Sequence, residues 1–306
     1  MDFILFMEKV KKSLVEFFGE GAEISIREVE KNNGVKLHGL TIIIENANIS
    51  PTIYMEGFYK EYCDGKPFGN VLYEIIQLYE ENKIYNRINM DFFTKYEQVR
   101  GRVFLKVINY EKNKERLDRL PHRRYLDLAV VCYFAYMNDL IGHGFIQIEN
   151  EHLTEWGISK EQLFADADKN VREKLYVDIK NMNEIIWEML KEEADERDLD
   201  EMRSALEQEE QKIPMYVMTL RGKYFGAACI YQTDVLSRFA QKTGKNFFIL
   251  PSSIHELILL PDEGRETPEG LRKMVTEVNH SHVEAEEQLS DNVYYFDKDS
   301  QTVQII

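Results

Sequence analysis

The sequence is poor in cysteine and has no long uncharged apolar run. Its three cysteines, Cys63, Cys132 and Cys229, are far apart and form no CxxC pair. This spacing favours buried free thiols in a reducing compartment over disulfides or a cysteine metal site. No segment approaches the ~18 uncharged apolar residues of a membrane-spanning helix, and the acid at Asp2 is not typical of a signal peptide. We therefore expect a cytoplasmic protein without a membrane segment.

Basic residues are outnumbered by acidic ones. The chain has 38 Lys and Arg against 54 Asp and Glu, which gives a formal net charge of −16. Negative charge repels phosphate backbones and anionic lipids, so neither nucleic acids nor membranes are expected partners. Residues 111–124 are a local exception, with Arg116, Arg119, Arg123 and Arg124 interleaved with acids. Because no glycine-rich loop accompanies them, a solvated connecting segment is favoured over a phosphate or nucleotide site.

The apolar content is high enough for a folded core, because 44% of the residues are hydrophobic and 12% are aromatic. Segment 3–18 has an apolar residue every three or four positions, which predicts an amphipathic helix. Segments 23–30 and 35–45 flank Asn33-Gly34, a dipeptide typical of tight hairpin turns. Residues 125–137 form an almost unbroken apolar run, as in a central strand. We predict an α+β fold of antiparallel hairpins and packed helices.

The composition changes in residues 192–211, where Glu and Asp are frequent. This change predicts an acidic helix or linker that joins an N-terminal α+β domain, residues 1–191, to a C-terminal α+β domain, residues 212–306. Upstream of it, Ser159 begins a capping-box sequence, and the apolar spacing predicts one long helix, or two successive helices, as far as residue 189.

Two segments share the order strand, turn, strand and capped helix. One leads from residue 125 to a helix beginning at Asn150, and the other leads from residue 215, through an expected strand at 225–231, to a helix beginning at Thr233. The shared order predicts either two pseudo-repeated subdomains or a chance recurrence in an ordinary α+β protein. Both alternatives stay open at the level of sequence.

The most function-like stretch is a polar corner between two apolar runs, formed by Ser252, Ser253, His255 and Glu256. A hydrolase could use a serine here as nucleophile, with the histidine as base and the glutamate as its orienting acid. However, the stretch lacks the G-x-S-x-G elbow, and Leu259 stands where a zinc-protease helix would need its second histidine. We favour a structural corner whose side chains bond the backbone, and assign no catalytic residue.

A second histidine cluster follows near the C-terminus. His280 and Glu284 would share one face of a helix, and so would His282 and Glu286. This arrangement could hold a divalent metal, but histidines at an exposed helix end are the favoured interpretation. We therefore predict no metal site and no cofactor.

Three stretches carry a resemblance to a known family. Residues Asn246–Glu256, which include the corner, resemble the hallmark of an uncharacterised domain-of-unknown-function family common in gut Firmicutes. Leu289–Tyr295 supports the resemblance, as does Trp156–Ser159 followed by Leu163–Asn170. The resemblance covers most of the chain and implies a bacterial protein. It brings no activity, cofactor or catalytic residue.

The absence of a complete catalytic constellation, the negative charge and the many aromatic residues together predict a soluble, non-catalytic protein that binds or regulates a protein partner. The alternative is a hydrolase centred on Ser252 or Ser253, His255 and Glu256.

Overall fold

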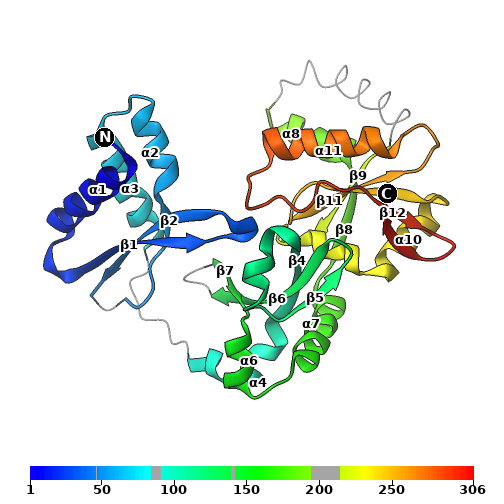
Figure 1. Ribbon diagram of the computed structural model, residues 1–306, viewed down its shortest axis with the longest axis horizontal. Coiled ribbons are helices and arrows are strands. Elements are labelled where there is room, and N and C mark those ends of the chain that lie inside the picture. Colours follow the sequence, from blue (N-terminus) through cyan, green and yellow to red (C-terminus); the bar gives the residue numbers. More distant parts are fainter. Residues whose placement is uncertain (46, 84–90, 139–141, 194–213) are drawn as a thin grey trace. The chain divides into compact units, whose positions relative to one another are not determined.

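The computed structural model of the chain describes residues 1–45, 47–83, 91–138, 142–193 and 214–306 (Figure 1). These residues form two compact units. Unit 1 comprises Met1–Lys95 and Tyr136–Gly144, and unit 2 comprises Tyr96–Ala135 and Phe145–Ile306. The elements are helices and antiparallel sheets, which confirms the predicted α+β class.

Unit 1 packs three helices against a three-stranded sheet of order β1-β2-β3. The predicted hairpin is confirmed, because β1 and β2 pair from Ala22↔Ile44 to Glu30↔Lys36. Asn33 and Gly34 adopt φ of 61° and 69°, the left-handed values that such a turn requires. The elements of this unit in the described residues are α1 (Phe3–Phe18), η1 (Gly19–Gly21), β1 (Ala22–Glu30), η2 (Asn32–Gly34), β2 (Lys36–Ile44), β3 (Ile53–Tyr54), α2 (Met55–Cys63), α3 (Phe68–Asn82) and η3 (Asp91–Thr94).

Most of a four-stranded sheet belongs to unit 2. Its strand order is β4-β6-β5, and β7 also pairs with β6. Val130, Val131 and Cys132 of β6 are fully buried, as predicted for the apolar run at 125–137. The elements around this sheet are α4 (Tyr96–Val99), η4 (Arg100–Arg102), β4 (Val103–Asn109), η5 (Glu111–Asn113), α5 (Lys114–Leu117), β5 (His122–Tyr125), β6 (Leu128–Asn138), β7 (Gly142–Gln147), α6 (Asn150–Trp156) and α7 (Lys160–Lys174).

A six-stranded antiparallel sheet, of order β13-β12-β10-β11-β9-β8 in the described residues, forms the other part of unit 2. Helix α11 covers one face through Leu271 and Val275, which pack with Phe248 of β10. Helix α10 covers the other face, where the Phe239 ring lies 5.0 Å from the Phe247 ring. Because both faces of β10 are covered, its sequence is continuously apolar. The elements are β8 (Val177–Asn181), α8 (Met182–Glu193), β9 (Tyr216–Leu220), η6 (Gly226–Tyr231), α10 (Thr233–Thr243), β10 (Phe247–Pro251), β11 (Glu256–Pro261), α11 (Pro268–His282), β12 (Tyr294–Asp297) and β13 (Thr302–Ile305).

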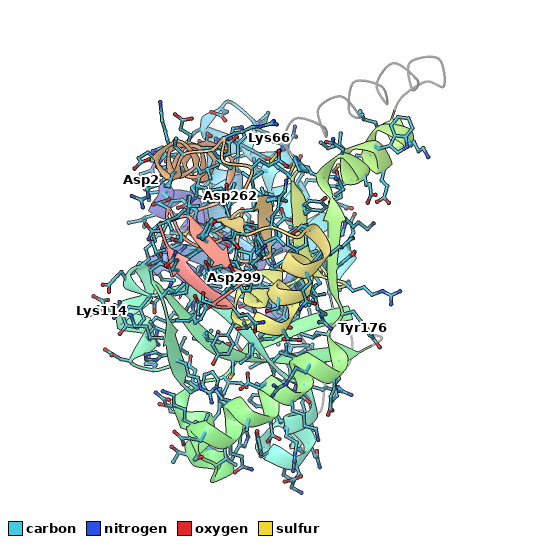
Figure 2. The ribbon with its side chains drawn as sticks, turned by 90° about the vertical axis from the view of Figure 1, so that its right-hand side faces the viewer. Asp2, Lys66, Lys114, Tyr176, Asp262 and Asp299 are labelled. Carbon is cyan, nitrogen blue, oxygen red and sulfur yellow. The ribbon has the colours of Figure 1, made fainter. Side chains whose placement is uncertain are left out.

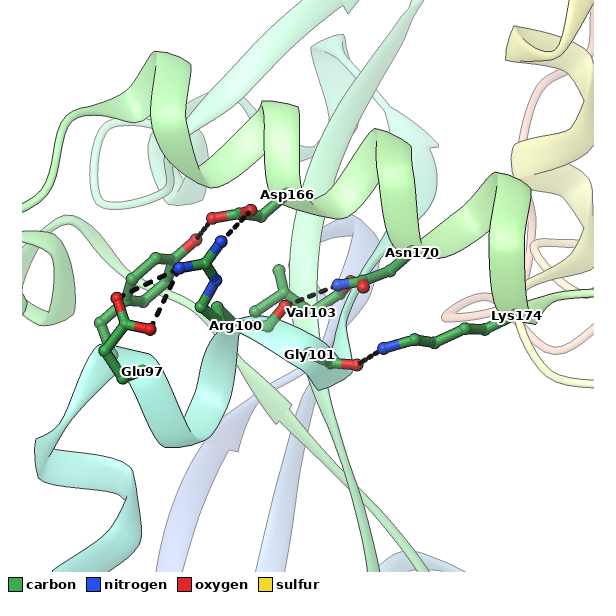
Figure 3. A network of polar contacts seen from close by, with 8 residues as sticks. Glu97, Arg100, Gly101, Val103, Asp166, Asn170 and Lys174 are labelled. Atoms are coloured by element: carbon green, nitrogen blue, oxygen red, sulfur yellow. Dashed lines mark hydrogen bonds and ion pairs between the residues drawn. The ribbon is translucent and has the colours of Figure 1, made fainter.

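Helix α7 is attached to the four-stranded sheet by a stripe of polar side chains four residues apart (Figure 3). Asp166 accepts a hydrogen bond of 2.8 Å from the Tyr96 hydroxyl. Asn170 is buried and donates to the carbonyl of Val103 at 3.0 Å, and Lys174 donates to the carbonyl of Gly101. The stripe therefore gives hydrogen-bond partners to backbone carbonyls of η4 and of the start of β4.

The division of the chain differs from the expected domains at 1–191 and 212–306. Strands β8 and β9 lie on either side of the acidic segment, and they pair antiparallel from Val177↔Leu220 to Asn181↔Tyr216. The acidic segment thus connects two neighbouring strands of one sheet. Apart from its first two residues, the segment expected at 192–211 lies outside the described residues.

The hypothesis of a pseudo-repeat is wrong. The second of the two compared segments has the 3-10 helix η6 where a strand was expected, whereas the first has the paired strands β6 and β7. The cause is close packing: a Cβ added to Gly226 would lie 2.5 Å from the carbonyl oxygen of His255. The small buried residues Gly226, Ala227 and Ala228 let this turn approach β9 and β11, and they carry no side chains suited to strand pairing.

Of the one or two helices predicted between Ser159 and residue 189, two are confirmed, α7 and α8, but the residues between them form the strand β8 instead of continuing the helix. Ser159 caps α7, accepting a hydrogen bond of 3.2 Å from the Gln162 amide, but α7 ends at Lys174 and β8 follows. Apolar and charged residues alternate in β8, so Val177 and Ile179 fit a strand as well as a helical stripe. Pairing with β9 stabilises the strand conformation of these residues over the helical one.

Candidate functional site

The polar corner joins β10 to β11, and its hydroxyl groups bond within the turn. Ser253 Oγ accepts a hydrogen bond of 3.0 Å from the His255 amide, and the Ser253 amide donates to the Glu256 carbonyl at 3.2 Å. Ser252 Oγ donates to Glu256 Oε1 at 3.3 Å. These bonds close a tight reversal of the chain, which is the usual role of serines at such positions.

The His255 side chain holds a neighbouring segment. Its Nδ1 accepts a hydrogen bond of 3.2 Å from the amide of Phe225, so in the neutral ring the proton lies on Nε2. Nε2 lies 3.6 Å from Glu287 Oε1. Both ring nitrogens therefore face groups other than a serine hydroxyl. The structure brings Ser252 and Glu256 together, but it does not assemble the serine–histidine–glutamate relay that a hydrolase would need.

Phe225, whose amide bonds to His255, has an unusual backbone conformation and many ring contacts. Its backbone is left-handed, with φ of 55° and ψ of 29°, a strain of roughly 1 kcal/mol for a bulky residue. Its ring stacks on the His255 ring at 5.4 Å and contacts those of Tyr133 at 4.8 Å and Phe145 at 5.1 Å. The Lys106 ammonium group lies 5.1 Å from its centroid. The corner thus anchors the approach of η6 to both sheets of unit 2.

A groove of about 600 Å³ lies elsewhere in unit 2, between the end of α7, strand β8 and helix α10. A second hollow of about 450 Å³ continues it, since both are lined by Val171, Arg172, Gln232 and Asp234. Figure 2 shows Tyr176 where α7 passes into β8, and this side chain is 68% exposed. The groove is open to solvent along one edge of the six-stranded sheet.

The charge of this groove is opposite to that of the whole chain. Arg172, Arg238 and Lys242 line it and are exposed, and among the lining residues within the described ranges Asp234 is the one carboxylate. Asp234 lies 3.4 Å from the Arg238 guanidinium in an exposed pair. The lining therefore has a surplus of positive charge in a chain whose net charge is −16.

The edge strand beside the groove has main-chain groups directed away from the sheet. Two hydrogen bonds show which residues of β8 bond to β9. The Arg221 amide donates to the Tyr176 carbonyl, and the Met182 amide donates to the Met215 carbonyl. In an antiparallel pair, hydrogen-bonded residues alternate with residues whose amide and carbonyl point outwards. Val177 and Ile179 belong to the outward set, and their side chains line the groove.

The comparison with protein families gives one match. Residues 3–298 match the family of unknown function DUF5688. The chain belongs to this family. No curated protein and no solved structure matches the chain. Among helices in the described ranges, none combines the length and apolar character needed to cross a bilayer.

The stretch Leu289–Tyr295, one of those that predicted a family of this kind, has a structural role. Asp127, in the turn between β5 and β6, accepts hydrogen bonds from Ser290 Oγ at 2.6 Å, Asn292 Nδ2 at 3.0 Å and the Tyr294 hydroxyl at 2.8 Å. Tyr294 is fully buried, and this burial together with the Asp127 charge raises its pKa well above 10.0. The network ties the two sheets of unit 2 together.

The arginines of residues 111–124 do not form a common anion site. Arg123 lies 3.2 Å from Asp168 and over the Phe164 ring, whereas Arg124 lies over the Tyr110 ring. Their alternation along β5 sends them to opposite faces.

The other titratable candidates lie apart from the groove. His280 and His282 end α11, and the part of the chain that the structure describes contains no cluster of three potential His, Cys, Asp or Glu ligands. Cys132 and Cys229 are buried free thiols, as predicted, and burial raises the pKa of Cys229 to about 12; Cys63 is exposed.

Sequence reasoning missed the groove entirely. Its residues come from α7 and β8, which follow each other in the chain, and from α10, which lies much later in the chain, and none of them belongs to a motif. The available signal was the alternation in Val177-Asp178-Ile179-Lys180, which is typical of a strand with two different faces. Its position at an edge depends on the order of the strands, which the alternation does not encode.

Proposed function

We propose that this chain is a non-catalytic, protein-binding protein of the bacterial cytoplasm that takes up an extended segment of a partner protein as an added strand on β8. The observation that carries the proposal is the outward direction of the Val177 and Ile179 main-chain groups beside an open groove. The compartment and the source rest on the sequence composition and on the family resemblance.

Strand addition supplies affinity through the backbone and specificity through alternate side chains. Val177 and Ile179 offer two amides and two carbonyls, and each hydrogen bond contributes about 0.5–1.5 kcal/mol net. Their side chains, with Val235 and Phe239 of α10, provide apolar surface next to these groups. An added strand would therefore bury main-chain and apolar groups in one step.

Catalysis at the polar corner has weaker support. A hydrolase built on Ser252 or Ser253, His255 and Glu256 would require His255 to turn away from the Phe225 amide. That amide would then lose its acceptor. The groove requires no such rearrangement, because its groups are already accessible.

The test is residue-resolved amide hydrogen exchange with a bound peptide. Ten-residue peptides are first selected from a displayed random library against the full chain. When a selected peptide binds, the amides of Val177 and Ile179 should gain protection. The amides of Asp178 and Lys180 point towards β9 and should change little, so they serve as internal controls. If no peptide binds, or if bound peptides leave Val177 and Ile179 unprotected, the proposal is wrong.

A further inference from the structure

We infer that the strand bound at β8 is acidic and turns carboxylates at alternate positions towards α10. This inference rests on the proposed function and adds the chemistry of the partner. It starts from the three cationic side chains of the groove, Arg172, Arg238 and Lys242, which face solvent beside the open edge.

The spacing of the cations suits a strand. Arg238 and Lys242 are four residues apart on α10, so they share a helix face and are about 6 Å apart along the axis. Side chains on one face of a β-strand repeat every second residue, or about 6.8 Å. Two carboxylates at positions i and i+2 of an added strand therefore have nearly the same spacing as the two cations.

The orientation of an added strand brings these groups together. Neighbouring strands turn their side chains to the same two faces of the sheet. The residues of the added strand that lie beside Val177 and Ile179 would share their face, which is the face covered by α10. Arg172, at the end of α7, lies at the other wall of the same groove and can meet a third acidic group.

Asp234 does not remove this preference. It pairs with Arg238 at 3.4 Å, but both side chains are mostly exposed, so the pair is weak. A guanidinium group has five N–H donors and can bind a second carboxylate. Arg172 and Lys242 have no carboxylate within ion-pair distance in the described residues, so their charge remains available.

The experiment compares three synthetic peptides that differ only at two alternate positions. One carries Glu at both positions, one carries Gln and one carries Lys, on a common Val-rich strand sequence. Each is titrated into the full chain by fluorescence anisotropy at low and high salt. We expect the Glu peptide to bind roughly tenfold more tightly than the Gln peptide at low salt, with the difference reduced at high salt.

A charge-reversal variant tests whether Arg238 and Lys242 cause the preference for acidic peptides. In the double variant Arg238→Glu, Lys242→Glu, the Lys peptide should become the preferred ligand. The matched control is Lys11→Glu, Lys12→Glu, which changes the net charge equally on exposed positions of α1 in unit 1. It should keep the preference for Glu to within about twofold, because screening limits the reach of surface charges. Circular dichroism checks that each variant is folded.

The outcomes separate the two proposals. If the Gln and Glu peptides bind equally while Val177 and Ile179 gain protection from exchange, the acidic preference is wrong and strand addition stands. If the control variant loses the preference as fully as the groove variant, the effect is one of net charge and the inference fails. If no peptide protects Val177 and Ile179, both the inference and the proposed function fail.

Discussion

The polar corner and the groove both place polar side chains beside apolar strands of unit 2, yet they use them differently. At the corner, the hydroxyls of the two serines and Nδ1 of His255 bond groups of the protein itself. In the groove, Arg172, Arg238 and Lys242 are exposed, and among the described residues no second strand pairs with β8 at the end of the sheet. The motif-like residues of the corner thus stabilise the fold, whereas the accessible groove is lined by residues that belong to no motif.

This contrast predicts that substitutions near the corner reduce stability, whereas substitutions in the groove change only binding. Buried donors and acceptors are costly to leave unpaired, whereas exposed charges contribute little to stability. Five experiments test this division.

The largest effect is expected for Gly226→Val. Its Cβ would lie 2.5 Å from the His255 carbonyl oxygen and 2.7 Å from the Leu220 amide, and backbone atoms cannot easily move aside. The free energy of unfolding should fall by about 3 kcal/mol or more, as measured by chemical denaturation. Gly222→Ala is the control, because its nearest neighbour would be 3.9 Å away. Equal stability of both variants would contradict a close approach of η6.

The next largest loss of stability is expected for Asp127→Ala. The variant leaves the hydroxyls of Ser290 and Tyr294 and the Asn292 amide without their shared acceptor. We expect a loss of about 3 kcal/mol in the free energy of unfolding. Ser300→Ala, in the exposed turn before β13, should change it by less than about 0.5 kcal/mol.

Alkaline pH probes the same network. The pKa of Tyr294 is raised above 10.0 in the folded chain, so folding favours the neutral phenol. Its contribution to stability is therefore complete below pH 10 and decreases above it, where the unfolded chain releases the proton more readily. Tyr294→Phe should reduce the slope of stability against pH in this range, measured by denaturation at several pH values. An unchanged slope would show that this phenol does not govern it.

His255→Ala tests whether the corner is structural or catalytic. Removing the ring leaves the Phe225 amide without its acceptor, so the free energy of unfolding should fall by about 1–2 kcal/mol. Ser252→Ala should cost less, because it removes one part-buried hydrogen bond. Both variants are also screened with esterase, protease and nuclease substrates. An activity of the parent that disappears in folded His255→Ala would favour the hydrolase alternative.

The smallest effect on stability is expected in the groove. Arg172→Ala, Arg238→Ala and Lys242→Ala should each change the free energy of unfolding by no more than about 0.5 kcal/mol, because these side chains are exposed. The same variants should weaken binding of the Glu peptide. A groove substitution as destabilising as His255→Ala would remove the distinction between the two sites.

Short-range hydrogen bonds set the ends of several elements. Asp2 caps α1 by accepting a hydrogen bond of 2.9 Å from the Leu5 amide, and Thr267 caps α11 in the same way at 3.2 Å. The Asn33-Gly34 turn also formed as predicted. These features depend on residues within a few positions of each other, so the sequence alone contains the information that decides them.

Patterns failed where partners far away in the chain decide the structure. The residues 177–181 fit a helical stripe until β9, which follows a long acidic segment, pairs with them. Residues 226–231 become a 3-10 helix because the His255 carbonyl and Thr219 hydroxyl leave no space for a larger side chain at Gly226. In both cases, tertiary contacts overrode local preference.

The sequence by itself determined the α+β class, the apolar core strands, the capped helices and the family resemblance, because periodicity and short-range hydrogen bonding set all of these. Only the tertiary structure decided which polar residues are enclosed and which are accessible. Strand order places β8 at an edge, and packing turns His255 inwards towards Phe225. Accessibility depends on what the rest of the chain covers, and no short stretch of residues carries that information.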